Sequence, residues 1–221
     1  NQIFLEDGVH DEQGEIVEID FPITIIGESK DGCTIIGGLN LTGKKEDDVN
    51  VKHLTISQSK GCGVYGYLGM SFHLFNLKIE KSEHGVFVQF TKRNTMSNCQ
   101  VSHSKYSGVN VFGGLITING SGTSIHNNVT GGDSDTYGLE TFDSSSFIFL
   151  VSPLTKESVS INNGDGGNYS SGPFDGTIKT IKVRTKEEVL CCVDAEGTLH
   201  VKPGLNSLSN AVIEANQYNI N

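Results

Sequence analysis

The segment from Gly131 to Glu140 is the part of the chain richest in side chains that could do chemistry. Asp133, Asp135 and Glu140 supply three carboxylates, and Tyr137 lies between them. Two carboxyl groups at a suitable separation act as acid and base, or as acid and nucleophile, in glycoside cleavage, and a tyrosine ring can stack on a sugar. The alternative is turn chemistry, because aspartates after glycines accept hydrogen bonds from nearby backbone amides.

A second polar group comes from a short phrase that repeats along the chain. Lys78, Glu80, Gln100 and His126 occupy outward positions in successive copies, between apolar residues. If the copies form adjacent strands, such side chains stand about 5–7 Å apart and could grip a sugar ring. The alternative is a solvated sheet face. The candidate ligand-binding residues are therefore Lys78, Glu80, Gln100, His126, Asp133, Asp135, Tyr137 and Glu140.

The repeated phrase has a nearly fixed period. Its last apolar residues, which are 23, 22, 24 and 36 positions apart, are Ile56, Ile79, Val101, Ile125 and Ile161. A period in this range is typical of a solenoid, in which each repeat buries its apolar face against its neighbours. These five residues are predicted to form one inward column. A second inward column is predicted from Leu54, Leu77, Cys99, Thr123 and Val159.

Each repeat contains three short stretches with strand-like alternation. A pair such as Phe72 and Leu74 precedes the phrase, and a glycine-led stretch such as residues 85–88 follows it. Three strands of period two in roughly 22 residues describe one coil of a parallel β-helix. Right-handed crossovers dominate parallel sheets, so we predict an all-β, right-handed parallel β-helix.

The C-terminal third is less regular. A polar loop is predicted at residues 163–176, looser strands at 177–202 and a short amphipathic helix at 205–217. We predict a single domain over residues 1–221, with regular coils at 1–165 and the helix as a cap. The helix caps either its own last coil or the first coil of a neighbouring molecule. The second alternative would make the chain one unit of a tandem array or a head-to-tail homo-oligomer.

Charge and composition exclude several classes of partner. Acidic residues outnumber basic residues by 26 to 16, and the only arginines are Arg93 and Arg184. Nucleic-acid binding needs a basic patch, so no nucleic-acid partner is predicted. The longest apolar run, residues 147–151, is too short to insert across a membrane. Five cysteines without metal-ligand spacing predict neither a metal centre nor a complete disulfide framework, and no cofactor is expected.

Three N-terminal motifs are distinctive. Residues 3–9 read I-x-L-x-x-G-V, residues 23–27 read I-T-I-I-G, and residues 34–38 read T-I-I-x-G. With the coils that follow, to about residue 165, they resemble the pectin lyase-like superfamily of right-handed parallel β-helices. The resemblance is to the parallel β-helix repeats of its carbohydrate-binding and sugar-hydrolase group. It implies the fold and says almost nothing about activity.

The chain departs from the enzymes of that superfamily at the residues their chemistry uses. Arg93 and Arg184 lie in no lyase-like motif, and residues 133–135 do not reproduce the hydrolase-like carboxylate set. No catalytic residue is therefore assigned. We expect a non-catalytic binding or structural module that presents a flat polar face to a glycan or a protein, in an extracellular or surface-associated location. The alternative is a polysaccharide-acting lyase, hydrolase or epimerase.

Overall fold

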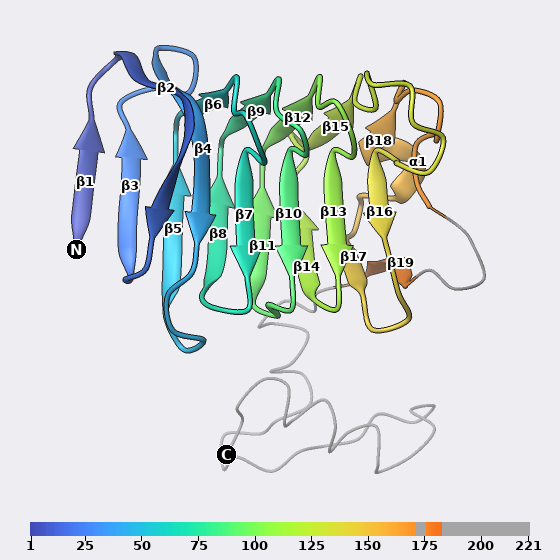
Figure 1. Ribbon diagram of the computed structural model, residues 1–221. Helices are drawn as coiled ribbons and strands as arrows, with labels where there is room; N and C mark the ends of the chain where they lie inside the picture. The colour runs from blue at the N-terminus through green and yellow to red at the C-terminus, as the bar shows by residue number, and fades with distance from the viewer. Residues whose placement is uncertain (171–175, 183–221) are drawn as a thin grey trace, which may run out of the picture. The chain divides into compact units, whose positions relative to one another are not determined.

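The computed structural model describes residues 1–170 and 176–182, which wind into a parallel β-solenoid (Figure 1). Its first face is an eight-stranded sheet. In spatial order the strands are β1 (Gln2–Leu5), β3 (Ile23–Gly27), β5 (Asp48–Lys52), β8 (Ser71–Phe75), β11 (Asn94–Ser97), β14 (Leu115–Asn119), β17 (Phe147–Val151) and β19 (Thr177–Ile181).

An eleven-stranded sheet supplies the other two faces, because the long strands β2 (Gly8–Ile19) and β4 (Cys33–Leu41) run through both. The second face continues from β4 with β6 (Thr55–Ser57), β9 (Lys78–Glu80), β12 (Gln100–Ser102), β15 (Ser124–His126) and β18 (Ser160–Ile161). The third face continues from β4 with β7 (Val64–Tyr67), β10 (Val86–Gln89), β13 (Val109–Phe112) and β16 (Leu139–Thr141). One short helix, α1 (Lys156–Val159), precedes β18.

The core is the narrow apolar column that the repeat predicts. Ile56, Ile79, Val101 and Ile125 pair in register across neighbouring strands, and all four are fully buried. Cys99 is buried as well, as expected for a small apolar residue. The prediction of an all-β parallel solenoid is therefore confirmed.

The predicted inward column is wrong at the last coil. Ser160 pairs with Ile125 and is buried, whereas Ile161 pairs with His126 and is exposed. Helix α1 ends with Val159 inside the core, so the chain enters β18 one residue out of the expected register. A slip of one residue moves every side chain of a strand to the opposite face.

Each coil turns three corners, and the backbone repeats its conformation at each. Residues at equivalent places have left-handed φ values between 53° and 60°. At the corner after the first face they are His53, Asn76 and Asn98; after the second face Gln58, Lys81, His103 and Asn127; after the third face Leu68, Phe90 and Gly113. This repetition aligns the outward side chains of successive coils.

The glycines that immediately precede the third-face strands allow the coils to pack closely. A Cβ atom on Gly85 would lie 2.2 Å from Val101 Cγ1, and one on Gly108 would lie 2.5 Å from Ile125 Cγ2. Glycine is required where one backbone approaches another segment this closely.

Residues Asn1–Ile181 form one compact unit. The strands predicted after residue 182 and the helix predicted at 205–217 lie outside the described residues, so the capping role and the single-domain prediction remain predictions. In the part of the chain that the structure describes, no helix is long and apolar enough to span a membrane.

Candidate functional site

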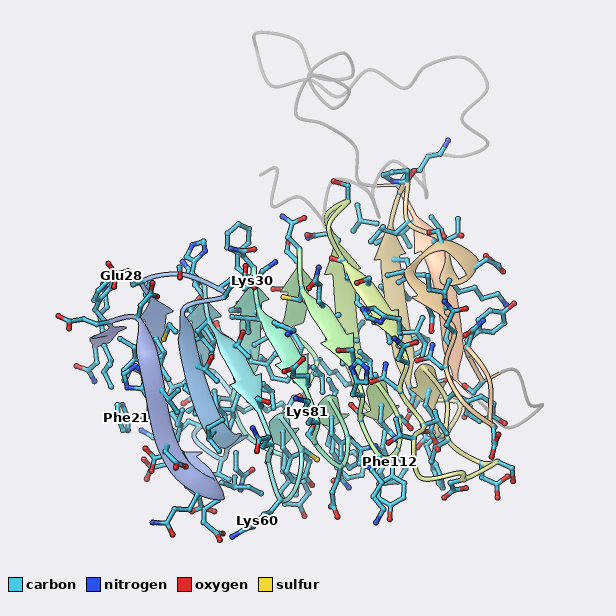
Figure 2. The ribbon with its side chains drawn as sticks, turned by 90° about the horizontal axis from the view of Figure 1, so that it is seen from above. Phe21, Glu28, Lys30, Lys60, Lys81 and Phe112 are labelled. Carbon is cyan, nitrogen blue, oxygen red and sulfur yellow. The ribbon has the colours of Figure 1, made fainter. Side chains whose placement is uncertain are left out.

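Four of the predicted site residues share the second face. Lys78 and Glu80 lie on β9, Gln100 on β12 and His126 on β15, and these strands are adjacent. Lys78 Nζ lies 2.9 Å from Glu80 Oε2, and Lys81 Nζ (Figure 2) lies 3.8 Å from Glu80 Oε1. The carboxylate of Glu80 therefore faces two ammonium groups.

His126 has another histidine as its ring neighbour. The centroids of the His126 and His103 rings are 6.4 Å apart, and burial together with His103 lowers the pKa of His126. Asp133, Asp135 and Tyr137 lie in the loop between β15 and β16. Asp133 accepts the backbone N–H of Asp135 at 3.0 Å, which is the contact that the turn alternative predicts.

Glu140 lies apart from that loop, on β16 of the third face. It pairs in register with Asn110, whose Nδ2 donates to Glu140 Oε2 at 2.9 Å, and the hydroxyl of Ser107 donates to the same oxygen. Only 6% of Glu140 is exposed. The predicted residues thus occupy the second face, one loop and the third face.

The third face carries aromatic side chains that are not among the predicted site residues. Tyr65 on β7 and Phe87 on β10 stack with their centroids 5.0 Å apart and their planes 22° apart, and Tyr67 stacks on Tyr65 at 5.7 Å. Tyr65 Oη donates to Gln89 Oε1. These rings cover one another's faces, so they bind neighbouring coils together and expose mainly their edges.

At the C-terminal ends of the third-face strands, the aromatic rings are tilted or edge-on to one another rather than stacked. Phe90 and Phe112 have centroids 5.0 Å apart with planes 50° apart, and Phe112 and Phe142 have centroids 5.4 Å apart with planes 77° apart. Figure 2 shows Phe112 on the outer side of the ribbon. We call the following five side chains the apolar ridge: Tyr67, Leu68, Phe90, Phe112 and Phe142.

The apolar ridge is exposed to solvent on three of its four coils, whereas Phe112 on the coil between Phe90 and Phe142 is half-buried. The exposed fractions of Tyr67, Leu68, Phe90 and Phe142 lie between 40% and 64%. The backbone joins them, since the N–H groups of Leu68, Phe90 and Phe142 donate to carbonyl groups of neighbouring coils. A group of exposed apolar side chains on one face marks an interaction surface more often than scattered ones do.

Two ridge residues, Leu68 and Phe90, have the left-handed conformation that recurs at the corners of the solenoid. Leu68 and Phe90 have φ values of 53° and 60°, a region that costs a non-glycine residue about 1–2 kcal/mol. Gly113 occupies the same corner in the next coil, and a Cβ atom there would lie 2.5 Å from the Phe90 ring. Because Gly113 has no side chain, the Phe90 ring can lie against it, where a Cβ atom would otherwise clash.

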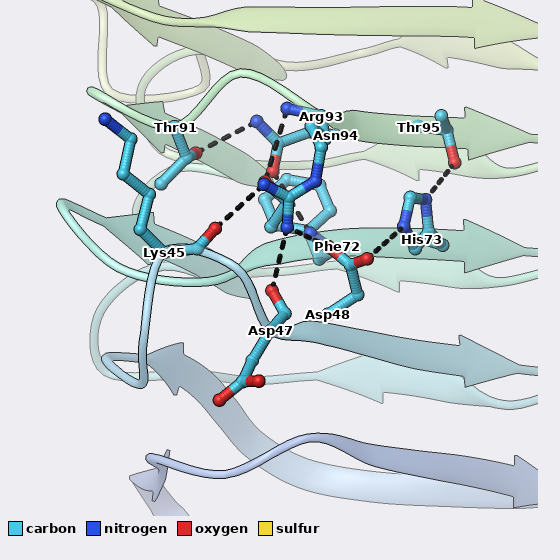
Figure 3. Close-up of polar contacts among 10 residues, drawn as sticks. Lys45, Asp47, Asp48, Phe72, His73, Thr91, Arg93, Asn94 and Thr95 are labelled. Carbon is cyan, nitrogen blue, oxygen red and sulfur yellow. Dashed lines mark hydrogen bonds and ion pairs between the residues drawn. The ribbon is translucent and has the colours of Figure 1, made fainter. Parts of the chain in front are cut away.

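Polar contacts fix the turn that carries Phe90 (Figure 3). Arg93 donates from Nη1 to the carbonyl of Lys45 at 2.8 Å and from Nη2 to Asp48 Oδ1 at 2.7 Å. Asp48 also lies 3.7 Å from His73 Nε2. Arg93 thus joins its own coil to the loop two coils earlier.

Asn94 completes this support from inside the solenoid. Its Oδ1 accepts the N–H of Phe72 at 3.1 Å, and its Nδ2 donates to Thr91 Oγ1 at 2.9 Å and to the Leu115 carbonyl at 2.8 Å. Asn94 is fully buried, and these partners satisfy both ends of its amide. The ridge is therefore held on a rigid scaffold.

The chemistry of the ridge is that of a binding surface. It offers ring faces, and the neighbouring positions on the face carry amide and hydroxyl groups from Gln89, Asn110 and Tyr65. In the described residues, no group of three or more His, Cys, Asp or Glu side chains is placed to hold a metal ion. A sequence signal did exist, because Tyr65 and Phe87 occupy equivalent positions of the glycine-led stretch, but a search for charged groups passes over aromatic rings.

Comparison with known proteins supports the fold. A family model described as a right-handed β-helix region matches residues 37–183, well over half of the chain. Neither the curated proteins nor the solved structures contain a significant match to this sequence.

Proposed function

We propose that the chain, which belongs to the right-handed β-helix family, is a binding module that holds a glycan against the apolar ridge. The observation that carries this proposal is the exposure of Leu68 and Phe90 at the same corner of neighbouring coils, and of Phe142 two coils further along the same face. Burying them would stabilise a complex, whereas leaving them in water contributes little to folding.

A glycan fits the size and chemistry of this surface better than a protein does. Stable protein interfaces use about 20–30 residues on each side, far more than a ridge of five side chains. Sugars combine apolar ring faces with hydroxyl groups, and the ridge offers aromatic rings beside Gln89 and Asn110. The fixed turn at Arg93 and Asn94 supports this function, because a surface ordered in advance loses less entropy on binding.

Two predicted acidic residues have contacts that suit a structural role. Glu80 is paired with Lys78 and Lys81, and Asp133 accepts a turn hydrogen bond. These contacts support binding over catalysis. The buried Glu140 beside Ser107 is the observation that favours the alternative, a polysaccharide-acting enzyme.

Affinity electrophoresis against neutral and uronate-containing polysaccharides tests the proposal. We expect retardation by at least one glycan, and about a tenfold loss of affinity in Phe142→Ser or Phe90→Ser, since burying most of a phenyl ring contributes about 1.5 kcal/mol. Lys78→Ala on the second face is the matched control and should bind like the wild type. Ridge variants with wild-type affinity, or no glycan binding at all, would contradict the proposal.

The same panel separates binding from catalysis. After incubation with and without calcium, a binding module leaves the number of reducing ends and the ultraviolet absorbance unchanged. An increase that disappears in Glu140→Gln would establish the enzymatic alternative instead.

A further inference from the structure

Thr95, His73 and Asp48 form a chain of polar contacts on the first face (Figure 3). We propose that these three residues form an acyl-transfer site, at which the hydroxyl group of Thr95 attacks carboxylic esters. This activity would be additional to glycan binding by the apolar ridge and does not rest on it.

The strand register brings the three side chains together. Thr95 on β11 is directly opposite His73 on β8, and Asp48 on β5 is opposite Ser71, two residues before His73. Residues two apart on a strand project from the same face, so Asp48 is the diagonal neighbour of His73. The chain of contacts therefore crosses three successive coils.

The two ring nitrogens of His73 have different partners. Nδ1 lies 2.8 Å from Thr95 Oγ1, and Nε2 lies 3.7 Å from Asp48 Oδ2. A carboxylate favours a proton on the nitrogen that faces it, so Nε2 carries the hydrogen and Nδ1 accepts the hydroxyl proton of Thr95. Catalytic contacts as long as the second one are common without substrate and tighten when substrate binds. A nucleophile, a base and an orienting acid in this order activate hydroxyl groups in hydrolases of unrelated folds.

Arg93 fixes the carboxylate of Asp48. Nη2 of Arg93 donates to Asp48 Oδ1 at 2.7 Å and to the Asp47 carbonyl at 3.2 Å, and Nη1 donates to the Lys45 carbonyl at 2.8 Å. With Oδ1 held by the guanidinium group, Oδ2 is the oxygen that faces His73. Asp48 is therefore a positioning residue, which holds the imidazole tautomer and stabilises the imidazolium that forms when Nδ1 takes a proton.

The reacting groups can be reached from solvent. The side chains of His73 and Asp48 are 32% and 37% exposed, and Thr95 is half-buried. Thr117 on β14 lies opposite Thr95, and its hydroxyl group has no hydrogen-bond partner among the described residues. At the strand spacing of about 4.8 Å, this hydroxyl group can donate to an oxyanion that forms on a carbon bonded to Thr95 Oγ1.

The reaction has two steps. Thr95 Oγ1 bonds to the carbonyl carbon of the ester while its proton passes to His73 Nδ1. The bond to the leaving alcohol then breaks, and the same proton passes to the alcohol, which leaves an acyl group on Thr95. Water attacks this second ester with His73 as the base, which releases the carboxylic acid and returns the proton to Thr95.

Incubation of the full chain with 4-nitrophenyl acetate, an acid quench and mass spectrometry of its peptides tests the proposal. We expect an acetyl group on Thr95, and on the serine of Thr95→Ser, which keeps the hydroxyl group. His73→Gln should slow this acetylation at least tenfold, because the base is lost. Thr24→Val is the matched control and should leave it unchanged. Thr24 lies in the same outward column of the first face, but its neighbour there is Asn50 and not a histidine.

Two substitutions of Asp48 test its positioning role. Asp48→Asn removes the charge and should slow acetylation of Thr95 about tenfold, and Asp48→Glu restores a carboxylate and should recover part of the rate. Acetylation of Thr95 no faster than that of Thr24, or an unchanged rate in His73→Gln, would overturn the proposal. The comparison of Thr95 with Thr24 within the wild type decides this even if a variant does not fold. Glycan binding is measured separately, so the proposed function would stand if this site is inactive.

Discussion

His84, in the turn that leads to β10, packs between the rings of Phe87 and Tyr106, and burial lowers its pKa to about 4. In an unfolded chain the pKa of histidine is about 6.5. Because the folded value is the lower one, the stabilising effect of neutral His84 is complete above pH 6.5 and is lost as the pH falls towards 4. The free energy of unfolding should therefore decrease by roughly 2–3 kcal/mol between pH 7 and pH 4.5 on account of this residue.

Urea unfolding of the wild type and of His84→Phe measures this contribution, since phenylalanine keeps the ring contacts and does not titrate. The difference in the free energy of unfolding between the wild type and His84→Phe should change by roughly 2–3 kcal/mol between pH 7 and pH 4.5. Parallel pH profiles would show that His84 is not buried as described.

Substitution of Leu68 tests whether this exposed ridge side chain contributes to binding rather than to stability. Leu68→Gly removes the cost, about 1–2 kcal/mol, of holding a non-glycine residue in the left-handed conformation. It also lowers the free energy of unfolding by about 0.5–1 kcal/mol, because glycine makes the unfolded chain more flexible. Because most of this side chain is exposed, we expect unchanged or slightly increased stability together with weaker glycan binding. A loss of stability of more than about 1 kcal/mol in urea unfolding would contradict this account.

Among the secondary-structure elements, each third-face strand follows directly after a glycine, and this glycine determines how closely the coils pack. Gly85→Ala places a Cβ atom 2.2 Å from Val101 Cγ1, and such overpacking costs about 1–3 kcal/mol. Gly122→Ala is the matched control, because its nearest atom would be 3.4 Å away. Thermal unfolding should show a lower melting temperature for Gly85→Ala alone. Equal effects of the two substitutions would contradict the packing described.

The strands of the second face could be predicted because their apolar residues keep one period. Ile56, Ile79, Val101 and Ile125 fall in register as the spacing requires. The last coil could not be predicted in the same way, since the one-turn helix α1 shifts Ser160 and Ile161 by one position. Periodicity carries no information about such a local insertion.

The candidate site was harder to predict than the fold. Residue type predicted charged side chains such as Glu80 as site residues. In the structure, Glu80 forms ion pairs within the second face. The exposure of Phe90 depends on a left-handed corner and on the space above Gly113, neither of which is visible in composition. Only Glu140 belongs both to the predicted set and to the third face that carries the ridge.

For the whole molecule, the solenoid provides a row of equivalent positions at the spacing of adjacent strands, about 4.8 Å. Such a scaffold can make the same contact repeatedly along a long ligand. Its stability comes from contacts between neighbouring coils. Assembly through the coil ends, as a tandem array or a homo-oligomer, stays a prediction from the sequence.

The central claim is that the apolar ridge, and not the second face, is the binding surface. Hydrogen exchange of backbone amides, with and without a saturating amount of the tightest-binding glycan, tests it most directly. We predict slower exchange on binding at residues 67–69, 89–92, 112–114 and 142–145. Protection confined to residues 78–80, 100–102 and 124–126, or to the loop at 131–137, would contradict the claim.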